Sequence, residues 1–230
     1  AQTSHSVNLT GIPSDAKVSL IYCDNPAWTC ITALPSMFST SWVTAPSMAH
    51  TLFAIYSATG IVDSNPGIKN AIEYWKQNPD NTELVSPLQK NDDLKQLDIA
   101  HTPWLRESER QTLRMQNIVK LADANYTKGI KDEAIKSLKA LQNSDGGWKW
   151  YTKCEKSSYW VSMEVLELIG TLKQVGYYAD DDIIGPMTAK AIAYIDREVV
   201  RLYNEQRDKR DYNIFCQFAY VRTLFADIPM

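Results

Sequence analysis

The chain has 230 residues, of which 44% are hydrophobic and 22% are charged. A chain of this size and composition can bury a substantial core as one body, which argues against a wholly disordered protein. Its formal net charge of -3 offers no basic surface to nucleic acid, and its apolar runs fall short of the roughly 18 residues that span a bilayer. We expect no nucleic-acid partner, and membrane anchoring only through a larger full-length parent.

The N-terminal segment differs in pattern from the rest of the chain. Val18, Leu20 and Tyr22 alternate with their neighbours, and a glycine-proline turn at 11–13 precedes them, which is typical of two short strands joined by a turn. Two strands do not form an independent sheet. We therefore interpret residues 1–24 as remnant strands and a linker of a preceding β domain.

From about Pro46 onward the pattern predicts helices. Apolar residues recur at helical spacing, and a capping box at Ser108 and Gln111 begins the third segment, whose apolar face is predicted to include Leu113 and Ile118. Short polar turns between segments favour antiparallel helical hairpins, which suit an α/α toroid or an open bundle, and periodicity alone leaves both open. The predicted helices span 46–60, 65–78, 107–125, 131–143, 158–176, 186–206 and 211–225.

The stretch "LQNSDGGWKWY", residues 141–151, combines a helix end, two glycines and three aromatic rings. The glycines allow backbone conformations that other residues resist, so a helix ending near Asn143 can reverse tightly. The rings can then cover the exposed helix end. We interpret this stretch as a structural clip between two helices, with the covering rings supplied by Trp148, Trp150 and Tyr151.

The clip also resembles a motif of a known fold. Gln142, Asp145, Gly146, Gly147 and Trp148 form a Gln-x-x-Asp-Gly-Gly-Trp pattern. It is similar to one in α/α-toroid proteins, which include terpenoid cyclases, thioester domains of the α2-macroglobulin and complement proteins, and some polysaccharide-active enzymes. The resemblance implies a mainly α fold, an α/α toroid over residues 25–230 whose ring is either complete or C-terminally incomplete within this chain. It implies a fold rather than a function.

A second resemblance is more specific. "NPAWTCITALPSM", from Asn25 to Met37, resembles the "NPAWYAVQALP" entry to the thioester domain of α2-macroglobulin-like proteins of Bacteroidetes. "NPGIKNAIEYWKQ", "LQKNDDLKQL" and "HTPWLRESE" follow in the order of that family's pattern. The resemblance implies an endopeptidase inhibitor or protease trap of the periplasm or outer-membrane-associated cell envelope, whose partners are proteases and other domains of the same large chain.

The reactive element of that family is missing. A Cys-x-Glu-Gln element forms the internal thioester there, and the corresponding residues in this sequence are Thr44, Ala45, Pro46 and Ser47. A thioester requires a thiol, and Thr44 has none. The resemblance therefore implies a thioester-less domain that cannot couple covalently to a target. Trp42, beside this vacated thioester position, is a candidate to fill the space of the reactive bond.

Other candidate residues have simpler structural interpretations. The acidic run 180–182 could supply a cyclase acid or hold magnesium, but carboxylates are also favourable before a helix N-terminus. His50 and His101 could act as general bases, yet neither has a nucleophile or carboxylate at a recognisable spacing. Cys216 lies among aromatic residues and is predicted to be a buried thiol.

The cysteine spacing does not predict a metal site. The four cysteines form no CxxC pair, and the histidines lie far from them in sequence, so we expect no metal and no cofactor. Cys23 and Cys30 could form a disulfide or remain free thiols.

We expect no catalytic residues and a non-covalent protease-trapping role. Two alternatives stay open. One is a toroid enzyme acting on polysaccharide or isoprenoid, which would need carboxylates such as Glu155 in a cleft beside Trp150. The other is a structural scaffold domain without protease contact.

Overall fold

A computed structural model describes residues 25–38, 43–79, 84, 103–178, 183–205 and 212–230, together with positions 6, 8, 10, 11 and 13. This described part is mainly helical and contains no strand, only isolated bridges. The strands predicted within 17–22 lie outside the described residues. The elements are α1 (Pro26–Ala33), a 3-10 helix η1 (Leu34–Met37), α2 (Ala45–Ser64), α3 (Pro66–Gln77), α4 (Pro103–Lys120), α5 (Ala124–Leu141), α6 (Tyr159–Gln174), α7 (Ile184–Glu205) and α8 (Tyr212–Leu224).

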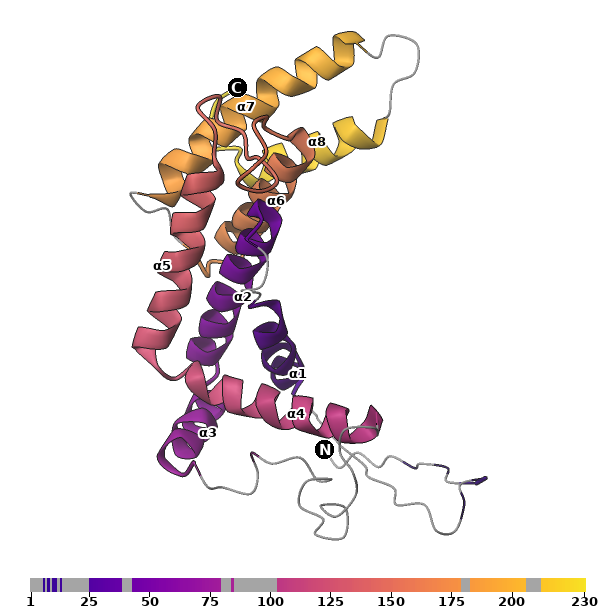
Figure 1. The fold of residues 1–230 in the computed structure, drawn as a ribbon, viewed down its shortest axis with the longest axis vertical. Helices are drawn as coiled ribbons and strands as arrows, with labels where there is room; N and C mark the ends of the chain where they lie inside the picture. Colours follow the sequence, from indigo (N-terminus) through magenta and orange to yellow (C-terminus); the bar gives the residue numbers. More distant parts are fainter. Residues whose placement is uncertain are drawn as a thin grey trace.

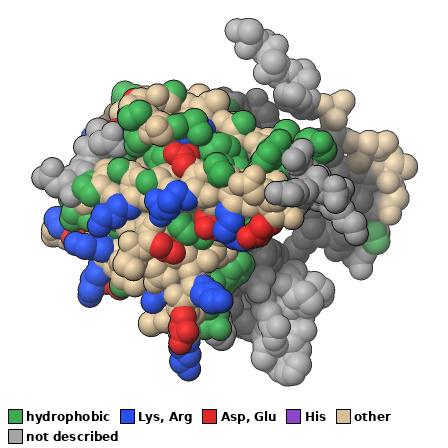
Figure 2. Space-filling view, turned by 90° about the horizontal axis from the view of Figure 1, so that it is seen from above, with side chains coloured by type: hydrophobic (Ala, Val, Ile, Leu, Met, Phe, Trp, Pro, Cys, Tyr) green, Lys and Arg blue, Asp and Glu red, His purple; other side chains and the backbone are tan. Residues whose placement is uncertain are grey.

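The helices form an elongated body (Figure 1). Helices α2 and α5 lie side by side along its length, and α2 also packs against α6. Helices α1, α3 and α4 gather at one end, whereas α7 and α8 lie at the other end against α6. Basic and acidic side chains are interspersed rather than segregated by sign on the face seen in Figure 2.

Helix α2 joins two hydrophobic cores. Its N-terminal half contributes Met48 and Leu52 to a core shared with α5, α6, α7 and α8. Its C-terminal half contributes Ile55 and Val62 to a second core with α1, α3 and α4. Because α2 is covered on several sides, its sequence is apolar almost all round rather than amphipathic.

Most predicted helices are confirmed, but one helix was not predicted and helix ends need correction. Helix α1 was not among the predicted helices. Helix α2 continues past Gly60 to Ser64, and a Cβ at Gly60 would come within 2.5 Å of the Tyr177 ring. That glycine therefore permits close packing rather than ending the helix. The predicted start at Ser108 is wrong, because α4 begins five residues earlier at Pro103, where proline suits the first turn.

Two predicted burials are also wrong. Leu113, expected on the apolar face of its helix, is 56% exposed, whereas Ile118 of the same helix is fully buried. Cys216, expected to be a buried thiol, is exposed. In both cases the periodicity marked an apolar residue correctly but could not say which face a neighbouring helix covers. No helix in the described part of the chain is long and apolar enough to cross a membrane.

Candidate functional site

The segment Thr44–Ser47 forms the N-terminal cap of α2. The Thr44 hydroxyl oxygen accepts a hydrogen bond from the Ser47 backbone N–H at 3.1 Å, and the Thr44 backbone N–H donates to the Ser47 hydroxyl at 3.0 Å. Pro46 lies in the first turn, where its missing N–H would have no helical partner, and Ala45 is fully buried. Thr44 and Ser47 therefore form a reciprocal capping box at the start of α2.

The tertiary fold brings this cap against the clip. The Ala45 backbone N–H donates to the Trp150 backbone oxygen at 3.0 Å, and Thr44 pairs with Tyr151 in an isolated antiparallel bridge. The two predicted sites, about a hundred residues apart in sequence, thus form one junction. Backbone pairing of this kind fixes the entry of α2 relative to the end of α5.

Two glycines of the clip are required for different reasons. Gly146 has a φ of +95, which favours glycine, and a Cβ there would come within 2.3 Å of the Lys190 backbone oxygen. Gly147 does not have a positive φ, in contrast to the expectation for a glycine pair. A Cβ at Gly147 would approach Ser157 and the Tyr194 ring to 2.7 Å. The first glycine makes the turn, and the second allows α7 to pack closely against it.

The polar clip residues make hydrogen bonds both within the clip and to neighbouring segments. The Gln142 side-chain amide donates to the backbone oxygens of Gly146 and Met187, at 2.9 and 2.8 Å. One Asp145 carboxylate oxygen accepts from the Gly147 N–H at 3.0 Å and from the Ser157 hydroxyl at 2.7 Å. The Gln142 bonds link the end of α5 to the start of α7, as a structural clip would.

The clip also caps the C-terminal end of α5. A helix leaves its last four carbonyl oxygens without helical partners. The Trp148 indole N–H donates to the Leu138 oxygen at 2.9 Å, and the Lys149 N–H donates to the Leu141 oxygen at 3.1 Å. Trp148 is fully buried, whereas Trp150 is 51% and Tyr151 is 47% exposed. Of the three rings expected to cover the helix end, only that of Trp148 is therefore fully buried.

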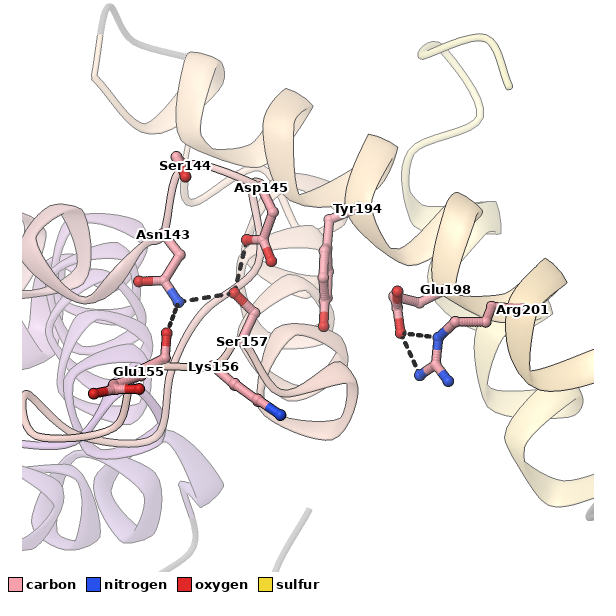
Figure 3. Close-up of a pocket in the computed structure, with 9 residues that line it drawn as sticks. All are labelled: Asn143, Ser144, Asp145, Glu155, Lys156, Ser157, Tyr194, Glu198 and Arg201. Carbon is pink, nitrogen blue, oxygen red and sulfur yellow. Dashed lines mark hydrogen bonds and ion pairs between the residues drawn. The ribbon is translucent and has the colours of Figure 1, made fainter. Parts of the chain in front are cut away.

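A polar pocket of about 460 Å³ opens between the clip and α7 (Figure 3). Figure 3 shows the Tyr194 ring between the Asp145–Ser157 hydrogen bond and the Glu198–Arg201 ion pair. The sequence did not indicate this site, because Ser157 lies in the loop before α6, Tyr194 lies in α7, and no motif joins them. The pocket is lined by Asn143, Ser144, Asp145, Glu155, Lys156, Ser157, Tyr194, Glu198 and Arg201.

Charges of both signs surround the Tyr194 ring. Arg201 pairs with Glu198 at 2.7 Å and with Glu205 on the next turn. Burial, followed by the charges of Glu198 and Asp145, raises the pKa of Tyr194 to about 12. The Tyr194 hydroxyl is therefore protonated at neutral pH and can both donate and accept a hydrogen bond.

The remaining candidate residues are distributed elsewhere. His50 Nε2 lies 3.0 Å from the Glu164 carboxylate and links α2 to α6 on a partly exposed surface. Cys154 hydrogen-bonds with Tyr151, which raises the pKa of that tyrosine, and Cys30 is an exposed free thiol. No group of residues in the described ranges could hold a metal ion. Four candidates lie outside the described residues: Cys23, Trp42, His101 and the acidic run 180–182.

The chain was compared with protein-family models, with curated proteins and with solved structures, and none of them matches it.

Proposed function

We propose that this chain is a thioester-less domain of an α2-macroglobulin-like protein and serves as a non-covalent part of a protease trap in the cell envelope. In this proposal it has no catalytic residues and needs no cofactor. Its partners are proteases and other domains of the same large chain. The finer fold belongs to the same proposal: an α/α toroid over 25–230, preceded by strands of a β domain within 1–24.

One observation carries the non-covalent part of the proposal. The residues that align with the thioester element form a capping box, and the first of them is a threonine rather than a cysteine. A threonine hydroxyl cannot form a thioester, and in this cap it is already hydrogen-bonded to Ser47. Replacing this cap by a strained reactive bond would also remove the reciprocal bonds at the start of α2.

The helix packing is compatible with a toroid. Helix α2 packs against α5 and α6, and α6 packs against α7 and α8, as successive hairpins of a toroid would. The clip fixes the turn between α5 and α6 through side-chain bonds to backbone oxygens. These features support the toroid.

The pocket beside the clip gives the enzyme alternative a specific observation. Glu155 lines it together with Asp145 and Glu198, as a toroid glycosidase would require. However, Trp150 is not among its lining residues. Asp145 is also held by Gly147 and Ser157, and Glu198 is held by Arg201. Carboxylates that are already hydrogen-bonded or ion-paired are poorly placed to exchange protons with a substrate. We therefore favour the non-enzymatic role.

The first test is chemical. The purified chain is incubated with methylamine and with an active protease, and intact mass and free thiols are then measured. We expect no methylamine adduct, no newly released thiol and no covalent protease adduct. A methylamine adduct within 44–47 or on any glutamine would contradict the proposal. A Cys154→Ser variant controls for oxidation or alkylation of the thiol closest in sequence to the clip.

The second test separates a trap from a scaffold. An antibody to this chain is used to isolate the cellular protein that contains it from the cell envelope. We expect the isolated protein to bind active proteases and to protect them from large inhibitors while small peptide substrates are still cleaved. Protease binding without that protection, or no binding at all, would favour the scaffold.

A further inference from the structure

The pocket beside the clip contains a tyrosine hydroxyl that the fold does not use. Tyr194 is 5% exposed, lines the pocket, and its hydroxyl has no hydrogen-bond partner within the described residues. In Figure 3 the hydroxyl end of the ring lies on the same side as the side chains of Ser157 and Lys156. The Tyr194 ring is largely buried, but its hydroxyl oxygen is not fully enclosed, so this oxygen can form hydrogen bonds with water or with a molecule bound in the pocket.

We propose that this pocket binds a neutral, hydroxyl-rich ligand, namely a saccharide unit, with Tyr194 as a central contact. The observations are the unused Tyr194 hydroxyl, a lining that is rich in both donors and acceptors, and a volume within the roughly 300 to 1,000 Å³ typical of small-molecule sites. This inference does not depend on the protease-trap proposal, because it concerns the pocket between the clip and α7 and is tested by saccharide binding rather than by protease binding.

The balance of charge favours a neutral ligand. Three carboxylates line the pocket, those of Asp145, Glu155 and Glu198, together with two cations, Lys156 and Arg201. Arg197, which donates to the Asp145 backbone oxygen at 2.6 Å, adds a third cation beside it. The carboxylates would repel an anionic ligand and the basic groups would repel a cationic one, so neither kind of ligand gains a net electrostatic attraction.

The chemistry of the lining matches hydroxyl groups. A hydroxyl donates one hydrogen bond and accepts two. Carboxylates such as Glu155 can accept only, Lys156 can donate only, and Tyr194 can do both. Adjacent hydroxyls of a saccharide can therefore bridge acceptors and donors of the lining, whereas an apolar ligand would leave these polar groups unpaired.

Titration with saccharides tests this site. Glucose, mannose and N-acetylglucosamine are added separately to the isotope-labelled chain at up to about 50 mM, well above a weak Kd of about 1 mM. We expect at least one of them to shift amide signals of the clip and of the Tyr194 turn of α7. Sodium phosphate and glycine at the same concentrations should shift them less.

A variant pair identifies the contact. Tyr194→Phe keeps the ring packed against Gly147 but removes the hydroxyl, and we expect affinity to fall about 2- to 10-fold, the effect of one hydrogen bond. Tyr203→Phe removes another tyrosine hydroxyl of α7, outside the pocket lining, and should bind like the parent chain. Lys156→Met changes an exposed lining residue and should also weaken binding.

Two results would overturn the inference. One is the absence of any saccharide-induced shift at the clip and α7. The other is saccharide binding that is unchanged in both Tyr194→Phe and Lys156→Met. Preferential binding of phosphate or glycine would replace the saccharide by a charged ligand and would equally reject the proposal.

Discussion

The Trp148 indole nitrogen lies 2.9 Å from the Leu138 backbone oxygen and donates a hydrogen bond to it. Both side chains are fully buried. This bond satisfies one of the carbonyl groups that the end of α5 leaves without a helical partner. The most buried aromatic ring of the clip is therefore both a packing element and a helix cap.

Trp148→Phe should destabilise the chain by about 1 to 3 kcal/mol, because it leaves the Leu138 oxygen buried without its donor. Trp148→Ala should cost about 3 to 5 kcal/mol, because it also opens a cavity in the core. Urea denaturation followed by far-UV circular dichroism measures both. Trp160→Phe is the matched control: its ring is 52% exposed, and a change within about 0.5 kcal/mol is expected. Equal effects at Trp148 and Trp160 would contradict the capping role.

Gly146→Ala should be strongly destabilising, by about 1 to 3 kcal/mol for the strained φ alone, with a further cost from the clash with the Lys190 backbone oxygen. Gly129→Ala should have the opposite sign. Gly129 lies inside α5, and no described atom lies within 4 Å of an added Cβ, so alanine should stabilise the helix by about 0.5 to 1 kcal/mol. Thermal denaturation of the two variants makes the comparison. A harmless Gly146→Ala would mean that the clip turn adopts another conformation.

Thr44→Ala removes the hydroxyl that caps α2 and should lower the free energy of unfolding by about 0.5 to 2 kcal/mol. Thr44→Ser keeps the capping oxygen and should change it much less. Because Ala45 donates to the Trp150 oxygen, amide hydrogen exchange of Ala45 should also accelerate in the alanine variant. Equal stability of Thr44→Ala and the parent chain would show that the cap contributes nothing.

Tyr159→Phe should reduce the loss of unfolding free energy that occurs as the pH rises above about 10. Burial, followed by the charges of Asp196 and Glu198, raises the pKa of Tyr159 from about 10 to about 12. Below pH 10 the tyrosine is protonated in both states. Between pH 10 and 12 the unfolded chain loses this proton first, so the folded state becomes less stable, by about 2 to 3 kcal/mol in total.

At pH 7 the same substitution should be neutral or stabilising by about 1 kcal/mol, because the Tyr159 hydroxyl is buried and has no hydrogen-bond partner within the described part of the chain. Urea denaturation at pH 7 and at several values up to pH 12 measures both effects. The same alkaline slope in Tyr159→Phe and the parent chain would assign the decline to other groups, Tyr194 first among them.

Local sequence signals predicted most helices and the clip. Ser158 caps α6, and the following apolar residues recur at helical spacing, so both the start and the buried face of that helix could be read directly. Gly146 marked the turn because a positive φ is a local property that glycine accepts. The helix predictions held because capping and backbone conformation depend on residues only a few positions apart.

Tertiary structure decided which surfaces are covered and which residues meet. The exposure of Leu113 and Cys216 could not be predicted, because local periodicity does not show where the next helix packs. The bond between Ala45 and Trp150, and the position of Tyr194 beside the clip, join residues far apart in the chain. Their proximity is set by the packing of α2, α6 and α7 around a shared core, which no local pattern encodes.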